Sequence, residues 1–154
     1  MAQTTAHMSW LDAAVYVNGA GSGSAWTDVT GQGASIAIGG GVRSHGEQNT
    51  MGTEDKPLVG HGKLSARTLT CRFVYTEEDT EGFEVVRALH EAHGGTMYVQ
   101  YRVKASGVWY KTGKAMCESL LLPGGEAGSG DIIMSEFVCI CASVDQASAS
   151  DPGA

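Results

Sequence analysis

Two histidines and two cysteines are the residues in this chain whose spacing could support metal chemistry. His90 and His93 stand three residues apart, so on a helix they would lie on one side and could share a metal ion. The zinc-protease pattern requires H-E-x-x-H, however, and this chain has H-E-A-H. We therefore interpret the two histidines as residues of a helix C-terminus, where a positive charge suits the helix dipole.

The cysteine pair is Cys139 and Cys141, which form a C-x-C sequence. On a strand, alternation places both sulfur atoms on one face. A zinc site would need a second ligand pair, and the histidines are not spaced to supply one. With Cys71 and Cys117, the chain has four cysteines and no secretory signal, so we expect free thiols. We interpret Cys139 and Cys141 as small core residues beneath a sheet.

Phosphate and carboxylate chemistry are equally poorly supported. Gly62-Lys63 and Gly113-Lys114 both lack the glycine five places earlier and the following Ser or Thr that a phosphate-binding loop requires. The acidic residues in 77–81 are typical of a capped helix start and a solvated surface. The chain has no G-x-S-x-G elbow either. The sequence therefore predicts no catalytic residue, no metal and no cofactor, and the protein is not expected to be an enzyme.

The composition indicates a single domain with many turns. The chain has 154 residues, of which 42% are hydrophobic, 22 are glycine and only 3 are proline. Its formal charge of −7 argues against non-specific binding to nucleic acid or to an anionic membrane. No apolar run is long enough for a transmembrane helix, and the N-terminus has neither the basic nor the apolar region of a signal peptide. We therefore expect a protein that is made and kept in a cytoplasm.

The middle of the chain has the clearest periodicity. Residues 68–75 alternate, with Leu69, Cys71, Phe73 and Tyr75 on one face, which predicts a half-buried strand. A helix is expected over about 79–93, with Phe83, Val86 and Leu89 along its core-facing stripe. Gly94 and Gly95 are typical of a helix C-cap.

Further strands are expected on both sides of this segment. They are 11–19 (a strand or an ordered arm), 34–41, 96–103, one or two strands around Gly113, and a long final strand over 132–144. Residues 41–63 form the longest stretch without periodicity, which we interpret as a partner-binding loop or an extended hairpin. The expected organisation is an N-terminal arm (1–10), one β domain (11–145) and a flexible C-terminal tail (146–154).

One region of the chain resembles a known family. A Lys-Pro loop at 56–57, an alternating strand ending in "FVYTEED", the helix "TEGFEVVRALHEAHGG" and the strand "MYVQYRV" follow one another directly. Downstream, "GKAMCESLLLPGGEAGSGDIIMSEFVCICASV" is similar to a closing strand pair around a glycine-rich loop. This order resembles the major tail tube proteins of long-tailed bacteriophages over roughly residues 56–145.

The resemblance implies a mainly β fold, with two packed antiparallel sheets or a distorted barrel flanked by one helix. It also implies a structural virion protein that forms hexameric rings, which stack into a hollow tail tube for DNA passage. The implied partners are other copies of the chain, the tape-measure protein, and the tail-tip or baseplate and tail terminator proteins. DNA would pass without sticking, no membrane is involved, and assembly would take place in the cytoplasm of the bacterial host.

Three physical features agree with an assembling protein. Exposed strand edges could continue a sheet from one subunit to the next. Six copies with a formal charge of −7 each would make an acidic ring that repels phosphate. The arm, the 41–63 segment and the tail could order on contact between rings. Within 41–63, the inter-ring contact candidates are Arg43, His45, Glu47, Met51, Glu54, Asp55 and Lys56.

Two other classes of function remain open on the sequence alone. The first is a related structural protein, such as a secretion-tube subunit or a head-decoration protein, which shares β scaffolds and assembly loops. The second is a small β-barrel enzyme or ligand-binding protein, which would show a polar pocket and stay a monomer or small oligomer.

Overall fold

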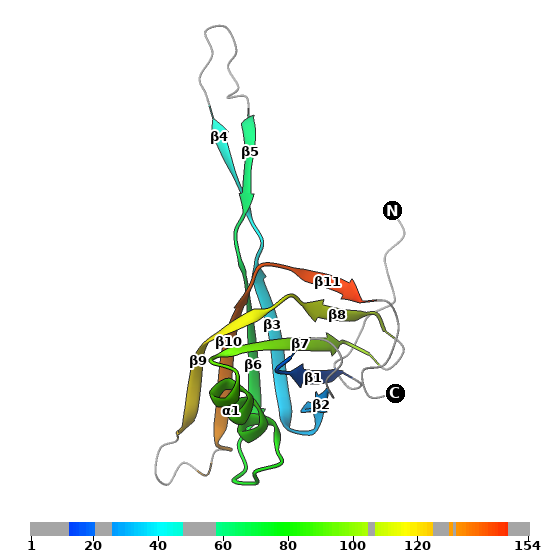
Figure 1. Cartoon of the computed structure of the whole chain (residues 1–154), viewed down its shortest axis with the longest axis vertical. Coiled ribbons are helices and arrows are strands. Elements are labelled where there is room, and N and C mark those ends of the chain that lie inside the picture. The colour runs from blue at the N-terminus through cyan, green and yellow to red at the C-terminus, as the bar shows by residue number, and fades with distance from the viewer. Residues whose placement is uncertain are drawn as a thin grey trace, which may run out of the picture.

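The described part of the chain folds mainly into β structure with one α-helix (Figure 1). The computed structural model describes residues 13–20, 26–47, 58–104, 107–124, 130 and 132–147. The strands are β1 (Ala14–Asn18), β2 (Thr27–Asp28), β3 (Gly33–Gly40), β4 (Arg43–Glu47), β5 (Leu58–Leu64), β6 (Arg67–Val74), β7 (Thr96–Arg102), β8 (Trp109–Thr112), β9 (Ala115–Gly124), β10 (Met134–Cys141) and β11 (Val144–Ala147). The helix is α1 (Gly82–Ala92), and a short 3-10 turn covers Thr30–Gln32.

Nine of these strands form one antiparallel sheet that folds over into two layers, and β4 and β5 form a separate two-stranded sheet. The upright layer consists of β3, β6, β10 and β9, and the cross layer consists of β2, β1, β7, β8 and β11. The strands of the two layers run across each other (Figure 1). The predicted fold of packed antiparallel sheets with one helix is confirmed, and the sheet does not close into a barrel in the described residues.

Two neighbouring strands bend together where the layers meet. β8 passes into β9 at Gly113 and Lys114, and β10 passes into β11 at Ala142 and Ser143. Cys141 pairs with Ala115 before the bend and Val144 pairs with Thr112 after it. The Gly113 N–H donates to the Ser143 carbonyl at 3.0 Å, which ties the two bends to each other. One strand pair therefore serves both layers, as in orthogonally packed sheets.

This bend corrects two expectations. The expected final strand over 132–144 begins at Met134 and ends at Cys141, and a further strand follows it. That strand includes Gln146 and Ala147, which the sequence assigned to the tail, because β11 pairs with β8 through both residues. Residues 148–154 lie outside the described part of the chain.

The core lies between the layers and is built by the alternation in β6 and β10. Leu69, Cys71 and Phe73 point inward from β6 and are at most 2% exposed. Phe137 on β10 stacks on Phe73 with ring centroids 5.5 Å apart. From the cross layer, Val17, Met97 and Val99 complete this contact surface, and all are fully buried. The inward face predicted for residues 68–75 is therefore the core face.

Helix α1 lies against β7, β10 and the 3-10 turn, and it begins later than the expected residue 79. The Glu81 N–H donates to the Glu78 carbonyl at 3.0 Å, so residues 78–81 form a turn before the helix. Glu81 is the N-cap without a side-chain hydrogen bond. At the other end Gly94 and Gly95 have φ of 60° and 81°, and the Gly95 N–H donates to the His90 carbonyl at 2.8 Å. This is a Schellman cap, as the two glycines predicted.

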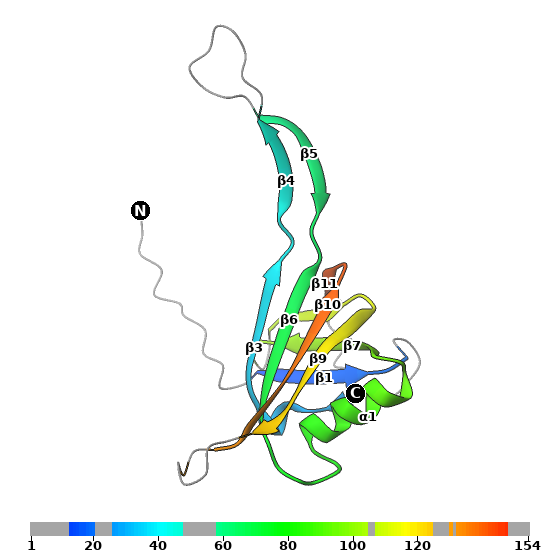
Figure 2. The same cartoon turned by 90° about the vertical axis from the view of Figure 1, so that its left-hand side faces the viewer.

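Residues 41–63 form an extended hairpin for most of their described length, because β4 and β5 pair with each other and with no other described strand. Figures 1 and 2 show this hairpin projecting from the end of β3 and β6, away from the rest of the body. Gly40 and Gly41 lie where it leaves the sheet, with φ of 81° and 70°. Left-handed backbone of this kind favours glycine because a Cβ is strained there.

A substitution of Gly40 tests this junction. A Cβ at Gly40 would collide with the Ala66 carbonyl oxygen, in addition to the strain of its φ of 81°. We expect Gly40→Ala to lower the free energy of unfolding by about 1–3 kcal/mol. Gly39→Ala is the matched control, because a Cβ there meets nothing within 4 Å. Chemical denaturation of both variants checks this, and equal stabilities would contradict the assigned role of Gly40.

Candidate assembly surfaces

The base of the hairpin exposes apolar and basic side chains. We call residues 42–44 and 62–65 the hairpin stem. Val42 and Leu64 are 69% and 49% exposed there. The Ser65 N–H donates to the Val42 carbonyl at 2.9 Å, and the Val42 N–H donates to Ser65 Oγ at 3.0 Å. Both charged residues of the stem, Arg43 and Lys63, are cationic and exposed. The stem is therefore an exposed surface on a hydrogen-bonded backbone.

The opposite end of the upright layer exposes a larger apolar group. Leu121 and Leu122 at the end of β9 are 59% and 65% exposed, and Ile132 and Ile133 before β10 are 70% and 46% exposed. The Tyr75 N–H donates to the Ile133 carbonyl at 2.9 Å, which joins this group to the segment that follows β6. Exposed apolar side chains that gather in one place are typical of an interaction surface.

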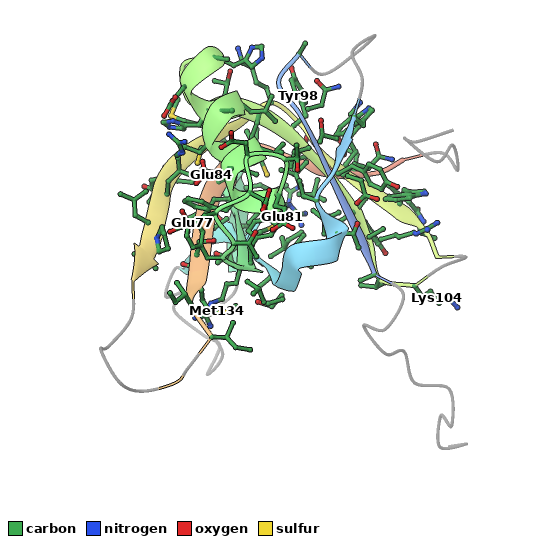
Figure 3. All side chains as sticks on the ribbon, turned by 90° about the horizontal axis from the view of Figure 1, so that it is seen from below. Glu77, Glu81, Glu84, Tyr98, Lys104 and Met134 are labelled. Carbon is green, nitrogen blue, oxygen red and sulfur yellow. The ribbon has the colours of Figure 1, made fainter. Side chains whose placement is uncertain are left out.

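Acidic side chains accompany this apolar group. Glu77, Glu78 and Asp79 follow Tyr75 after one intervening residue and are exposed. Figure 3 looks at this end and shows Glu77 on the same side as Glu81, Glu84 and Met134, with Lys104 far from them. We call residues 77–79, 121–122 and 132–133 the acidic end. It lies at the end of the body away from the hairpin (Figures 1 and 2).

Helix α1 lies beside the acidic end, and its one arginine, Arg87, forms ion pairs with carboxylates of the same helix. Arg87 Nε donates to Glu84 Oε2 at 2.7 Å, and Arg87 Nη1 donates to Glu91 Oε1 at 3.1 Å. Burial and the nearby carboxylates of Glu84 and Glu77 raise the pKa of Tyr75. Arg87 is therefore engaged by carboxylates of its own helix, and no ion pair joins it to the carboxylates of residues 77–79 in the described part of the chain.

Two strands of the upright layer have free edges in the described residues. β3 pairs only with β6. β9 pairs with β10 along its length, but with β7 only through Ala115 and Met116. Residues 118–124 of β9 thus have one strand partner each at most. Unpaired edges of this kind can pair with another chain.

The structure places only some of the predicted site residues. Arg43 is exposed at the start of β4, whereas His45 and Glu47 are in β4 with side chains that lie outside the described part. Met51, Glu54, Asp55 and Lys56 also lie outside the described residues. On the helix, Phe83 is 3% exposed, Val86 is fully buried, and Leu89 is partly buried against the core. The sequence reasoning missed the acidic end as a surface, although consecutive isoleucines and leucines beside a glycine-rich loop are its signal.

The structure tests the metal and ligand sites that were considered from the sequence. No group of His, Cys, Asp and Glu within the described residues could hold a metal ion. A cavity of about 170 Å³ lies between β1, β3 and β6, and both apolar residues such as Val15 and Phe73 and polar residues such as Thr30, Ser35 and Arg72 line it. Ligand sites for small molecules are usually about 300–1,000 Å³. No helix of the described chain has the length and apolarity to span a membrane.

The four cysteines are buried free thiols. Burial raises the pKa of Cys71 and of Cys141, and the hydrogen bond with Cys117, together with burial, raises the pKa of Cys139. Cys139 and Cys141 share the inward face of β10. The same hydrogen bond with Cys139 lowers the pKa of Cys117, whose side chain is nevertheless buried. We therefore assign all four cysteines to the core because of their burial.

Thiol labelling tests that assignment. We expect the native protein to react with an aromatic disulfide reagent at pH 8 only at the rate of its unfolding or local opening. In guanidinium all 4 thiols should react at once. A thiol that reacts rapidly in the native protein would contradict the core assignment of the cysteine that mass spectrometry then identifies.

Comparison with solved structures decides the fold. A chain from the tail of an empty gene transfer agent particle, refined helically with C6 symmetry, superposes with a TM-score of 0.64 at 14% identity, over 96% of this chain and 100% of the other. This is the tail tube fold. No protein-family model matches the sequence, and a comparison with curated proteins finds no match.

Two further structures share the tail tube fold. A chain of the sheath–tube complex of an extracellular contractile injection system in its extended state gives a TM-score of 0.60 at 16% identity, over 92% of this chain and 91% of the other. A chain from the tube-terminating cap of the anti-feeding prophage gives 0.58 at 13% identity, over 96% and 95%. The predicted tail tube resemblance is confirmed at the level of the fold. The similarity covers 92–96% of this chain in the three structures.

Proposed function

We propose that this chain is a structural tail protein whose copies form stacked hexameric rings, and that the rings build a hollow tube through which DNA passes. The observation that carries the proposal is the near-complete superposition on a chain from a particle tail with C6 symmetry. The described residues support a structural role, because their exposed features include strand edges and apolar ends.

The free edges of the upright layer allow neighbouring copies to pair and close a ring. β3 lies at one side of this layer and residues 118–124 of β9 lie at the other. Pairing of β3 in one copy with β9 in the next would continue the sheet around a ring, with the same interface repeated at each step. Backbone pairing of this kind depends little on side chains, which is consistent with a fold shared at 14% identity.

The charge of the chain suits the passage of DNA. Each copy has a formal charge of −7. A ring of such copies repels phosphate at distances within about one Debye length, roughly 10 Å at 0.1 M salt, so DNA would slide without binding. On the outer face of the upright layer Arg72 Nε lies 3.4 Å from Glu136 Oε2, so this cation is paired with a carboxylate.

The proposed partners follow from the tube. They are further copies of the chain, a tape-measure protein that sets the length, and the tail-tip or baseplate and terminator proteins at the two ends. Structures of the same fold come from a sheath–tube complex, a terminator, a cap and a baseplate. We place the assembled protein in the virion tail and its assembly in the cytoplasm of the bacterial host.

A second candidate is a tube subunit of a contractile injection machine. The match to a chain of an extracellular contractile injection system favours it. The two candidates differ in whether the tube carries a sheath, and both require stacked rings.

Mass measurement tests the ring itself. Native mass spectrometry and light scattering of the full chain are expected to show a particle of six times the 16.0 kDa chain mass, or multiples of it. A different closed stoichiometry would contradict the hexamer while keeping a ring. A mass of one chain at every concentration would contradict self-assembly in the absence of a nucleus.

A further inference from the structure

We propose that the hairpin stem of one copy docks on the acidic end of a copy in the neighbouring ring. The proposal rests on the proposed function, since it needs stacked rings, and it names the surfaces that join them. The partner is therefore a second copy of this chain, bound head to tail.

The positions of the two surfaces fit this contact. The stem leaves the body where β3 ends and β6 begins, and the acidic end lies where β6 ends and β10 begins. The two surfaces thus stand at opposite ends of the same antiparallel strands (Figures 1 and 2). Contact between different surfaces of identical chains repeats along an axis when the two surfaces face opposite ends of the body, because the contact then does not close into a ring. That is the symmetry that stacking of rings requires.

The apolar parts of the two surfaces are complementary. Val42 and Leu64 are exposed on the stem, and Leu121, Leu122, Ile132 and Ile133 are exposed on the acidic end. In an isolated chain each of these side chains is exposed to water. Burial of apolar surface against apolar surface drives association, and it needs no precise pairing of groups.

The charges are complementary as well. Arg43 and Lys63 on the stem are both basic, and Glu77, Glu78 and Asp79 on the acidic end are all acidic. No ion pair within the described part of the chain involves any of these residues. Opposite charges at a protein interface fix orientation and register, and like charges brought together oppose binding. Head-to-tail stacking brings opposite charges together, whereas head-to-head and tail-to-tail contacts bring like charges together.

Charge reversal tests the proposal with full-length chains. The stem variant carries Arg43→Glu and Lys63→Glu, and the end variant carries Glu77→Lys and Glu78→Lys. Lys104→Glu with Lys114→Glu is the matched control for the stem variant, because both lysines are exposed and lie outside the two surfaces. Negative-stain micrographs count tubes, solution mass reports rings, and thermal unfolding verifies that each variant is folded.

Each reversal alone is expected to reduce the number and length of tubes at least about tenfold while leaving the rings intact. The control should form tubes like the wild type. A mixture of preformed rings of the stem variant and the end variant should regain tubes, because the acidic stem of one then meets the basic end of the other. Restoration in the mixture is the decisive supporting result.

Two results overturn the proposal in distinguishable ways. If the wild type forms tubes and both the stem variant and the end variant form normal tubes, the rings stack through other surfaces. The proposed function would then stand. Reduced tubes from both variants without recovery in the mixture would show that the two surfaces do not meet. A wild-type chain that forms neither rings nor tubes at any concentration overturns the proposed function and this inference together.

Discussion

Removal of the hairpin is expected to abolish tube formation while leaving the domain folded. The variant replaces residues 43–64 by a two-residue Asn-Gly turn between Val42 and Ser65. These residues are already joined by a backbone hydrogen bond of 2.9 Å, which is the spacing that a tight β-turn closes. No described residue of the removed segment belongs to the buried core, so we expect the free energy of unfolding to change by less than about 1 kcal/mol.

The deletion variant should also act on wild-type tubes. It retains the edges of β3 and β9 and the acidic end, so it can close a ring and accept a wild-type stem. Because it offers no stem of its own, tubes should become shorter as its fraction in a mixture rises, as measured on micrographs. Tubes of normal length from the deletion variant alone would contradict the role given to the hairpin.

Truncation of Phe83 has the second large expected effect, and it acts on stability. Phe83 is 3% exposed and meets the ring of Tyr75 edge-on with centroids 6.0 Å apart. It therefore holds the start of α1 against the end of β6. We expect Phe83→Ala to lower the free energy of unfolding by about 3–5 kcal/mol, because the lost ring leaves a cavity.

A surface truncation separates this effect from the general cost of a shorter side chain. Val108 is 42% exposed in the connection between β7 and β8, and Val108→Ala is expected to change stability by no more than about 0.5 kcal/mol. Urea unfolding of the three proteins gives the comparison. A Phe83→Ala protein as stable as Val108→Ala would contradict the packing of α1 on the sheet.

The sequence predicted those elements whose periodicity is set by the core. β6 alternates because one face packs against Phe137 and the cross layer, so its inward residues could be named from the sequence. The end of α1 could be placed because Gly94 and Gly95 adopt positive φ. In each case a local physical requirement leaves its signature in nearby residues.

The hairpin and the bent strands have no local sequence pattern of this kind. β4 and β5 pair only with each other among the described strands, so the main sheet does not require either strand to alternate. β11 is a short edge strand whose partner, β8, lies far away in the sequence. Gln100 on β7 is 5% exposed, so this strand buries a polar side chain as well as Met97 and Val99. Pairing between distant segments decides these features, and a single sequence does not display it.

One of the two candidate assembly surfaces could be predicted from the sequence, and the other could not. The sequence singled out 41–63 because the segment lacks periodicity, and the structure shows that its described part projects from the body. The acidic end could not be assembled from the sequence, because Glu77, Leu122 and Ile132 come from separate segments. Only the ladder from β6 through β10 to β9 brings them to one end.

Electron microscopy of the purified full chain tests the central claim most directly. Negative-stain images at low and high concentration, with the solution mass measured on the same samples, report whether the chain builds rings and tubes. We expect hollow rings with sixfold symmetry that stack into tubes at high concentration or when tail-tip complexes are added. A protein that keeps the mass of one 16.0 kDa chain at both concentrations, and does not extend tail-tip complexes, would contradict this expectation.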